Sequence, residues 1–155
     1  MNVQTNIRGA APVGYIAELD PIEAGAVIYL RLWCAGSETR LKMISDFEIV
    51  LGHEQGQKAI KAFDTLYSLC VHHGRRPLLH HQVNCKCLGA DESCFANFIG
   101  YASEGNREDA LLIATNLIRP GMAAQLVNLA QDFGIALRLM TIKLSNYHNK
   151  TTTIH

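Results

Sequence analysis

The chain has 155 residues, which is the usual size of a single domain. Hydrophobic residues make up 48% of it and charged residues 18%, and these ordinary globular values exclude an intrinsically disordered chain. Fourteen basic residues balance fourteen acidic ones, so no overall charge favours nucleic acid or an anionic membrane as a partner.

The first predicted helix starts at Asp20-Pro21-Ile22-Glu23. The Asp20 side chain can accept hydrogen bonds from free backbone amides, and the fixed backbone angle of Pro21 suits the first helical turn. Apolar residues then recur at helical spacing until Gly36, which is expected to end the helix. The preceding residues show no periodicity and predict a flexible arm over residues 1–18.

Two further helices are predicted before the middle of the chain. One ends at Gly52, and the next, which is the longest, runs from near Glu54 to His73. Gly74 follows as an expected left-handed cap. Residues 74–89 have no helical period and predict an ordered loop of some sixteen residues. Most connections have only ~4–6 residues, so this loop needs something to hold it.

Three shorter helices are predicted in the second half of the chain. One covers residues 90–103, and the next begins after Asn106. Pro120 separates it from the last helix, which is expected to stop at Gly134. After Gly134 the pattern of residues 135–142 fits either more helix or at most one short strand, and the polar residues 143–155 predict a frayed tail.

These elements describe one domain rather than two. No internal repeat and no linker interrupts residues 19–142. Six helices with short connections can bury their apolar faces against one another, so we expect an all-α, single-domain helical bundle. A chain of this length buries roughly 70% of its unfolded surface and needs no metal merely to have a core.

The compartment follows from the apolar segments and the cysteines. No apolar stretch reaches the ~18 residues of a membrane helix, and the N-terminus lacks the apolar core of a signal peptide. Residues 24–35 form the most apolar early segment, which Arg31 interrupts. We therefore expect a cytoplasmic protein whose five cysteines are thiols or metal ligands rather than disulfides.

Cysteines and histidines are concentrated in the middle of the chain. In chain order they are Cys70, His72, His73, His80, His81, Cys85, Cys87 and Cys94. Zinc takes four such ligands tetrahedrally, commonly as two pairs that are close in sequence. The concentration of these residue types within twenty-five positions predicts a metal site.

Cys70, His73, Cys85 and Cys87 are the predicted zinc ligands. Cys70 and His73 are three residues apart at the end of a predicted helix, so their side chains face the same way. Cys85 and Cys87 lie just before another predicted helix, whose free amides would stabilise thiolates. A zinc ion held by these four residues would fasten the long loop.

Other assignments of these residues stay open. His72, His80 or His81 can supply the histidine ligand, and Cys94 can join the other cysteines around an iron–sulfur cluster, although the spacing matches no standard ferredoxin run. Cysteines are also common in cores without any chemical role, and this interpretation is favoured for Cys34 and Cys94.

The motifs favour a helical binding or regulatory protein with a structural zinc site over an enzyme. His53-Glu54 begins an H-E-x-x-H pattern, but Gln57 replaces the second histidine, and neither a phosphate-binding glycine loop nor a nucleophile elbow occurs. One alternative is a thiol sensor in which Cys85 and Cys87 change state on oxidation or metal loss. Another is an enzyme with an open zinc position. A protein partner fits these hypotheses, whereas membrane and nucleic acid are not expected.

Three segments resemble a small family of uncharacterised bacterial proteins. They are CVHHGRRPL from Cys70, CKCLGADE from Cys85 and EDALLIAT from Glu108, and the resemblance extends over roughly residues 20–140. The resemblance implies a bacterial protein and brings no activity, substrate or cofactor.

Overall fold

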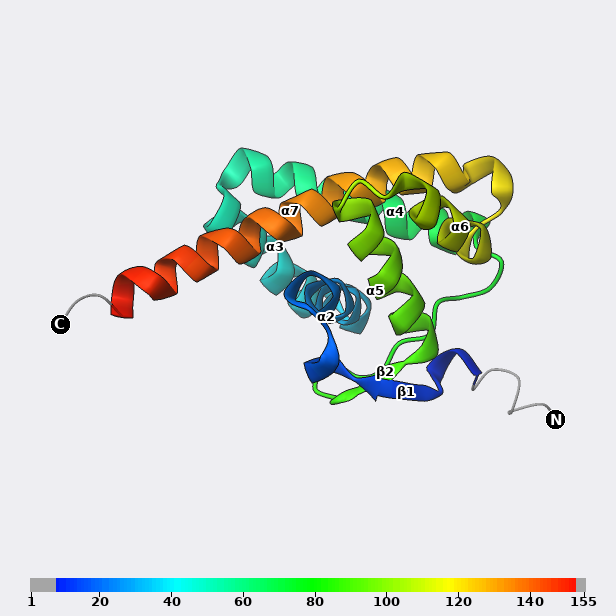
Figure 1. Cartoon of the computed structure of the whole chain (residues 1–155), viewed down its shortest axis with the longest axis horizontal. Helices are drawn as coiled ribbons and strands as arrows, with labels where there is room; N and C mark the ends of the chain where they lie inside the picture. The colour runs from blue at the N-terminus through cyan, green and yellow to red at the C-terminus, as the bar shows by residue number, and fades with distance from the viewer. Residues whose placement is uncertain (1–7, 153–155) are drawn as a thin grey trace.

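The computed structural model describes residues 8–152, in which six α-helices and one antiparallel two-stranded sheet are formed (Figure 1). The helices are α2 (Pro21–Ala35), α3 (Ser37–Leu51), α4 (His53–His73), α5 (Ala90–Ser103), α6 (Arg107–Leu117) and α7 (Pro120–Thr152). The strands and 3-10 turns are η1 (Arg8–Ala10), β1 (Pro12–Tyr15), η2 (Ile16–Glu18) and β2 (Cys87–Gly89). The expected all-α, single-domain fold is confirmed.

An aromatic cluster joins four helices at the centre of the core. Phe63 of α4 is fully buried, and its ring contacts those of Trp33 in α2, Phe95 in α5 and Phe133 in α7. The Phe63 and Phe133 ring centroids are 4.8 Å apart, and the Trp33 ring meets Phe63 edge-on at 5.3 Å. Such pairs stabilise the packing beyond the area that they bury.

The predicted signals at the ends of the first two helices are confirmed. Asp20 Oδ1 accepts a hydrogen bond of 2.8 Å from the backbone N–H of Glu23 at the start of α2. Gly36 and Gly52 follow α2 and α3 with φ angles of 145° and 89°, which favour glycine. Local sequence therefore sets where these helices begin and end.

Gly74 follows α4 in a different conformation from the predicted one. Its φ of −66° and ψ of 150° are extended rather than left-handed. A Cβ at this position would lie 2.1 Å from the carbonyl oxygen of Cys70, so the chain needs glycine because the backbone passes so close. Gly74 then forms an isolated antiparallel bridge with Ile118.

The predicted stop at Gly134 is wrong, because α7 continues through it to Thr152. No strand follows Gly134, and residues 143–152 are helical rather than frayed, while residues 153–155 lie outside the described part. A Cβ at Gly134 would lie 2.7 Å from the Cβ of Ser103 and 3.1 Å from the carbonyl oxygen of Ile99. The glycine therefore allows α5 and α7 to approach closely.

Replacing Gly134 with alanine is expected to lower the free energy of unfolding by about 1–3 kcal/mol, because α5 and α7 must move apart. Gly121, also in α7, is the matched control, since a Cβ there meets nothing within 4 Å. Gly121→Ala is expected to be neutral or to stabilise the protein by up to about 1 kcal/mol. Urea denaturation measures both variants, and equal destabilisation by both would contradict the close-contact explanation.

Residues 8–18 of the predicted flexible arm are ordered, and residues 1–7 lie outside the described part. Strand β1 pairs with β2, with Tyr15 opposite Cys87 and Pro12 opposite Gly89. The sheet lies below α2 and beside the start of α5 (Figure 1). Each strand is too short to show a clear alternation in sequence, which explains why neither was predicted.

The C-terminal end of α7 projects beyond the other helices (Figure 1). Leu144 and Tyr147 on this part of the helix are 48% and 66% exposed. Neither α7 nor any other helix within residues 8–152 combines the length and the apolar character that crossing a membrane requires.

Candidate functional site

An ion pair between Arg31 of α2 and Glu92 of α5 is buried beneath the loop that joins α4 to β2. Arg31 Nε and Nη2 donate to Glu92 Oε2 and Oε1 at 2.6 and 2.8 Å, and the side chains are 1% and 0% exposed. A bidentate pair of this kind is among the stronger hydrogen-bonded contacts in proteins.

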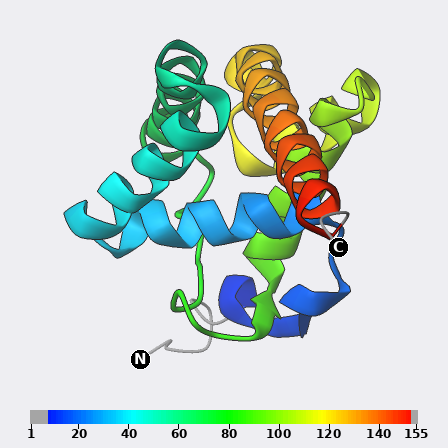
Figure 2. The ribbon, with the colours of Figure 1, turned by 90° about the vertical axis from the view of Figure 1, so that its left-hand side faces the viewer.

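The same pair holds the backbone of the loop, which runs down the bundle from α4 to the sheet (Figure 2). Arg31 donates to three carbonyl oxygens, those of Gln82, Cys85 and Cys87, at 3.2, 2.6 and 2.7 Å. Glu92 accepts hydrogen bonds of 3.3 Å from the backbone N–H of His81 and 2.9 Å from that of Gly89. One buried pair therefore satisfies five backbone polar groups, three in the loop and two in β2.

A second ion pair anchors the beginning of the loop. Arg76 makes two hydrogen bonds to the carboxylate of Asp91 at the start of α5, and the one from Nη1 to Oδ2 is 2.7 Å long. Asp91 Oδ2 also accepts a hydrogen bond of 2.8 Å from the backbone N–H of Leu79. The long loop, for which the sequence predicted a zinc clamp, is thus fastened at both ends by ion pairs.

The four predicted zinc ligands lie in different surroundings. Cys70 is buried in the core on α4, where burial raises the pKa of its thiol to about 12. A thiol in this apolar setting does not fit the role of a thiolate ligand. Cys85 in the loop and Cys87 in β2 are partly exposed, and His73 ends α4. Among residues 8–152 no three His, Cys, Asp or Glu side chains are grouped to hold a metal ion, and zinc binding stays a prediction.

The structure instead brings His81 and Cys85 together. His81 Nδ1 lies 3.4 Å from Cys85 Sγ, and His81 Nε2 lies 2.7 Å from the carbonyl oxygen of Ala10. A carbonyl oxygen can only accept, so Nε2 must carry a proton. In the neutral imidazole Nδ1 is then the unprotonated nitrogen and faces the thiol as a base. The Ala10 carbonyl therefore fixes both the orientation and the tautomer of His81.

The pair favours a thiolate at Cys85. The hydrogen bond from His81 lowers the pKa of the Cys85 thiol, and hydrogen bonding by the Cys87 backbone and the charge of Arg31 lower it further. The hydrogen bond with Cys85 raises the pKa of His81, and the Ala10 carbonyl adds to this effect. Both shifts favour a thiolate next to an imidazolium, as in proteins that use cysteine as a nucleophile.

Three other cysteines lie in apolar surroundings. All five cysteines are free thiols. Burial raises the pKa of Cys34, Cys70 and Cys94, so these thiols are protonated and unreactive at neutral pH. Cys85 is the residue whose surroundings lower the thiol pKa.

A groove of about 580 Å³ lies beside Cys85. Tyr15 and Ile16 of the N-terminal segment, Ile28 of α2 and Val83 of the loop contribute apolar walls. Tyr15 and Ile28 are 58% and 40% exposed, which is high for large apolar side chains. The groove therefore offers apolar surface directly next to Cys85.

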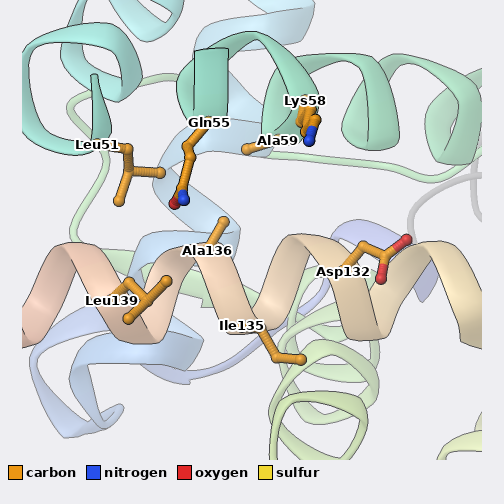
Figure 3. Close-up of a pocket in the computed structure, with 8 residues that line it drawn as sticks. All are labelled: Leu51, Gln55, Lys58, Ala59, Asp132, Ile135, Ala136 and Leu139. Atoms are coloured by element: carbon orange, nitrogen blue, oxygen red, sulfur yellow. The ribbon is translucent and has the colours of Figure 1, made fainter. Parts of the chain in front are cut away.

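A second hollow, of about 170 Å³, lies between α4 and α7 (Figure 3). Ala59 of α4 and Leu139 of α7 contribute apolar walls, and Gln55 points from α4 toward α7. Its lining contains no cysteine and no histidine, so it offers no chemistry comparable to that at Cys85.

Three residues of the site were not predicted from the sequence. In the sequence Arg31 only interrupts an apolar segment, although a charged residue on the buried face of a helix signals a buried partner. That partner, Glu92, is indistinguishable in sequence from an ordinary acidic residue in a first helical turn. The backbone carbonyl of Ala10 leaves no sequence signal at all.

No family model, no curated protein and no solved structure matches the chain. The resemblance to a bacterial family therefore stays a prediction.

Proposed function

We propose that this protein is a thiol-based sensor whose reactive residue is Cys85. The observation that carries this proposal is the contact between His81 Nδ1 and Cys85 Sγ, with His81 held in place by the Ala10 carbonyl. The thiolate is the reactive form of cysteine, and it reacts where it is solvent-accessible next to a cationic group. A reducing compartment such as the cytoplasm suits five free thiols.

The proposed reaction is oxidation by a hydroperoxide. The Cys85 thiolate attacks the terminal peroxide oxygen, and the O–O bond breaks. The departing oxygen takes a proton from the His81 imidazolium, which leaves a sulfenic acid on Cys85 and releases an alcohol or water. The Cys87 thiol then attacks the sulfenic sulfur, forming a disulfide with Cys85 and releasing water. The cysteines lose two electrons and the peroxide gains them.

Arg31 couples this chemistry to the fold. Its guanidinium donates to the carbonyl oxygens of both Cys85 and Cys87, and it is also paired with Glu92 in α5. A disulfide between two residues that share one donor changes the backbone to which Arg31 binds. This coupling supports a regulatory role, because a local redox change then biases a buried contact between helices.

Replacing His81 with glutamine is expected to slow alkylation of Cys85 by iodoacetamide severalfold at pH 7, because loss of the hydrogen bond from His81 returns the pKa of the thiol toward its ordinary value and lowers the fraction of thiolate. Since a lowered pKa moves the thiolate to lower pH, the rate profile of the wild type should rise below the ~8.5 of an ordinary thiol. Peptide mass spectrometry after timed labelling measures each cysteine separately.

His80→Gln is the matched control, because His80 is the exposed neighbour and its Nδ1 lies 3.2 Å from the His81 carbonyl oxygen rather than against Cys85. This variant should keep the wild-type rate and profile. Equal rates for the wild type and His81→Gln at all pH values would overturn the proposal.

Zinc binding by Cys85 is a second hypothesis, and it can be tested on the same samples. A thiolate bound to zinc is protected from alkylation, and zinc affinity falls on acidification because its ligands must lose protons. Elemental analysis of protein purified without added metal separates the two hypotheses. A sensor of the proposed kind reacts in samples that contain no stoichiometric metal.

A further inference from the structure

The apolar groove beside Cys85 bears on which hydroperoxide reacts there. The groove is lined by Cys85 itself together with Tyr15, Ile16, Ile28 and Val83, so a molecule seated in it touches the reactive residue. Its volume of about 580 Å³ is within the range of small-molecule sites, which are mostly apolar with a few polar groups.

The polar residues of the groove leave its apolar character intact. Arg31 is among the lining residues, but its donors are already bound to Glu92 and to loop carbonyl oxygens. Asn84 and Lys86 also line it and are exposed. The arrangement therefore combines apolar walls with a nucleophile, Cys85, whose Sγ lies 3.4 Å from His81 Nδ1.

We infer that Cys85 reacts preferentially with an organic hydroperoxide that has an apolar group, rather than with hydrogen peroxide. This inference rests on the proposed function and adds its substrate class. Burial of the apolar group against Ile28 and Tyr15 holds the peroxide oxygen close to the thiolate, which raises the rate of a reaction between two positioned groups. Hydrogen peroxide has no group that the walls can hold.

A comparison of the oxidation rates with two different oxidants tests the inference. The native protein is treated with cumene hydroperoxide or with hydrogen peroxide, and oxidation of the Cys85 peptide is followed by mass spectrometry. We expect cumene hydroperoxide to react at least about tenfold faster, which is the discrimination that a small apolar contact provides.

Ile28→Gln tests whether the groove is the cause. This residue is 40% exposed, and glutamine has a similar length, so the fold should persist and circular dichroism should be unchanged. The rate with cumene hydroperoxide should fall about tenfold, whereas the rate with hydrogen peroxide should stay within about twofold. Val13→Gln is the control, because Val13 is 57% exposed on β1 but does not line the groove.

The possible failures are distinguishable. If both oxidants modify Cys85 at similar rates in the wild type, the substrate class is wrong and the sensor proposal stands. If Ile28→Gln and Val13→Gln have equal effects, the groove does not select the oxidant. If neither oxidant modifies Cys85, both the inference and the proposed function are overturned.

Discussion

Replacing Glu92 with glutamine is expected to lower the free energy of unfolding by about 3–5 kcal/mol, the cost of breaking a buried ion pair on one side. The Arg31 side chain is 1% exposed, so the variant keeps a buried guanidinium without its counter-charge. Glutamine also has only one acceptor oxygen, whereas the two oxygens of Glu92 together serve Arg31 and the backbone of the loop.

Urea denaturation and limited trypsin digestion measure this effect. We expect a lower urea midpoint and faster cleavage after Arg75 and Arg76, because the loop loses one of its two anchors. Glu108→Gln is the control, since Glu108 is an exposed acidic residue in the first turn of α6 and should change stability by no more than about 0.5 kcal/mol. Equal losses in the two variants would show that burial of the pair contributes little.

The same pair makes stability depend on pH in a defined direction. Burial alone would raise the pKa of Glu92, but the hydrogen bonds from Arg31 and the Gly89 backbone outweigh it and lower the pKa. A lowered folded-state pKa gives stability that is fully present above the unfolded value, about 4.3, and is lost as pH falls through the folded value. The difference in stability between wild type and Glu92→Gln should therefore shrink in acid.

Replacing Phe63 with alanine is expected to cost about 3–5 kcal/mol of unfolding free energy. The Phe63 ring is fully buried and contacts aromatic rings from three other helices, so its removal leaves a cavity at the centre of the core. These neighbours are themselves large and held by their helices, which limits collapse into the cavity. Thermal and urea denaturation measure the loss.

Leu112→Ala is the control for Phe63→Ala, because Leu112 is 67% exposed on α6 and should change stability by no more than about 0.5 kcal/mol. A loss below about 1 kcal/mol for Phe63→Ala would contradict the central position of the aromatic cluster. The rate of Cys85 alkylation at neutral pH should be unchanged in folded Phe63→Ala, since the Phe63 ring packs against core aromatic rings rather than against the His81–Cys85 pair.

Local signals were sufficient to predict most helices. The Asp20 cap, the glycines after α2 and α3, and the apolar spacing of α4 act within a few residues of where they occur. Gly74 and Gly134 were misinterpreted because a glycine required by a close neighbour looks the same in sequence as one required by a positive φ. The neighbours are another backbone segment and another helix, which no local pattern reveals.

The candidate site was predictable in location but not in pairing. The sequence placed unusual cysteines and histidines in the long loop, and Cys85 lies there. Helical spacing grouped Cys70 with His73, whereas the structure pairs Cys85 with His81. Which histidine faces the thiol depends on Ala10, 71 residues earlier in the chain, and therefore on the folded arrangement.

Because the low pKa of Cys85 depends on contacts that only the folded chain makes, unfolding should change the labelling rates of Cys85 and Cys70 in opposite directions. His81 lowers the Cys85 pKa most, and Ala10, 71 positions from His81, holds its ring in place, while Arg31 acts from 54 positions away. These effects vanish in the denatured chain, so the thiol returns to an ordinary pKa near ~8.5. At neutral pH, loss of structure should then slow labelling of Cys85 while it exposes Cys70 and speeds labelling there. A single labelling experiment therefore reports on unfolding through two signals of opposite sign, because the two rates approach each other as the chain denatures.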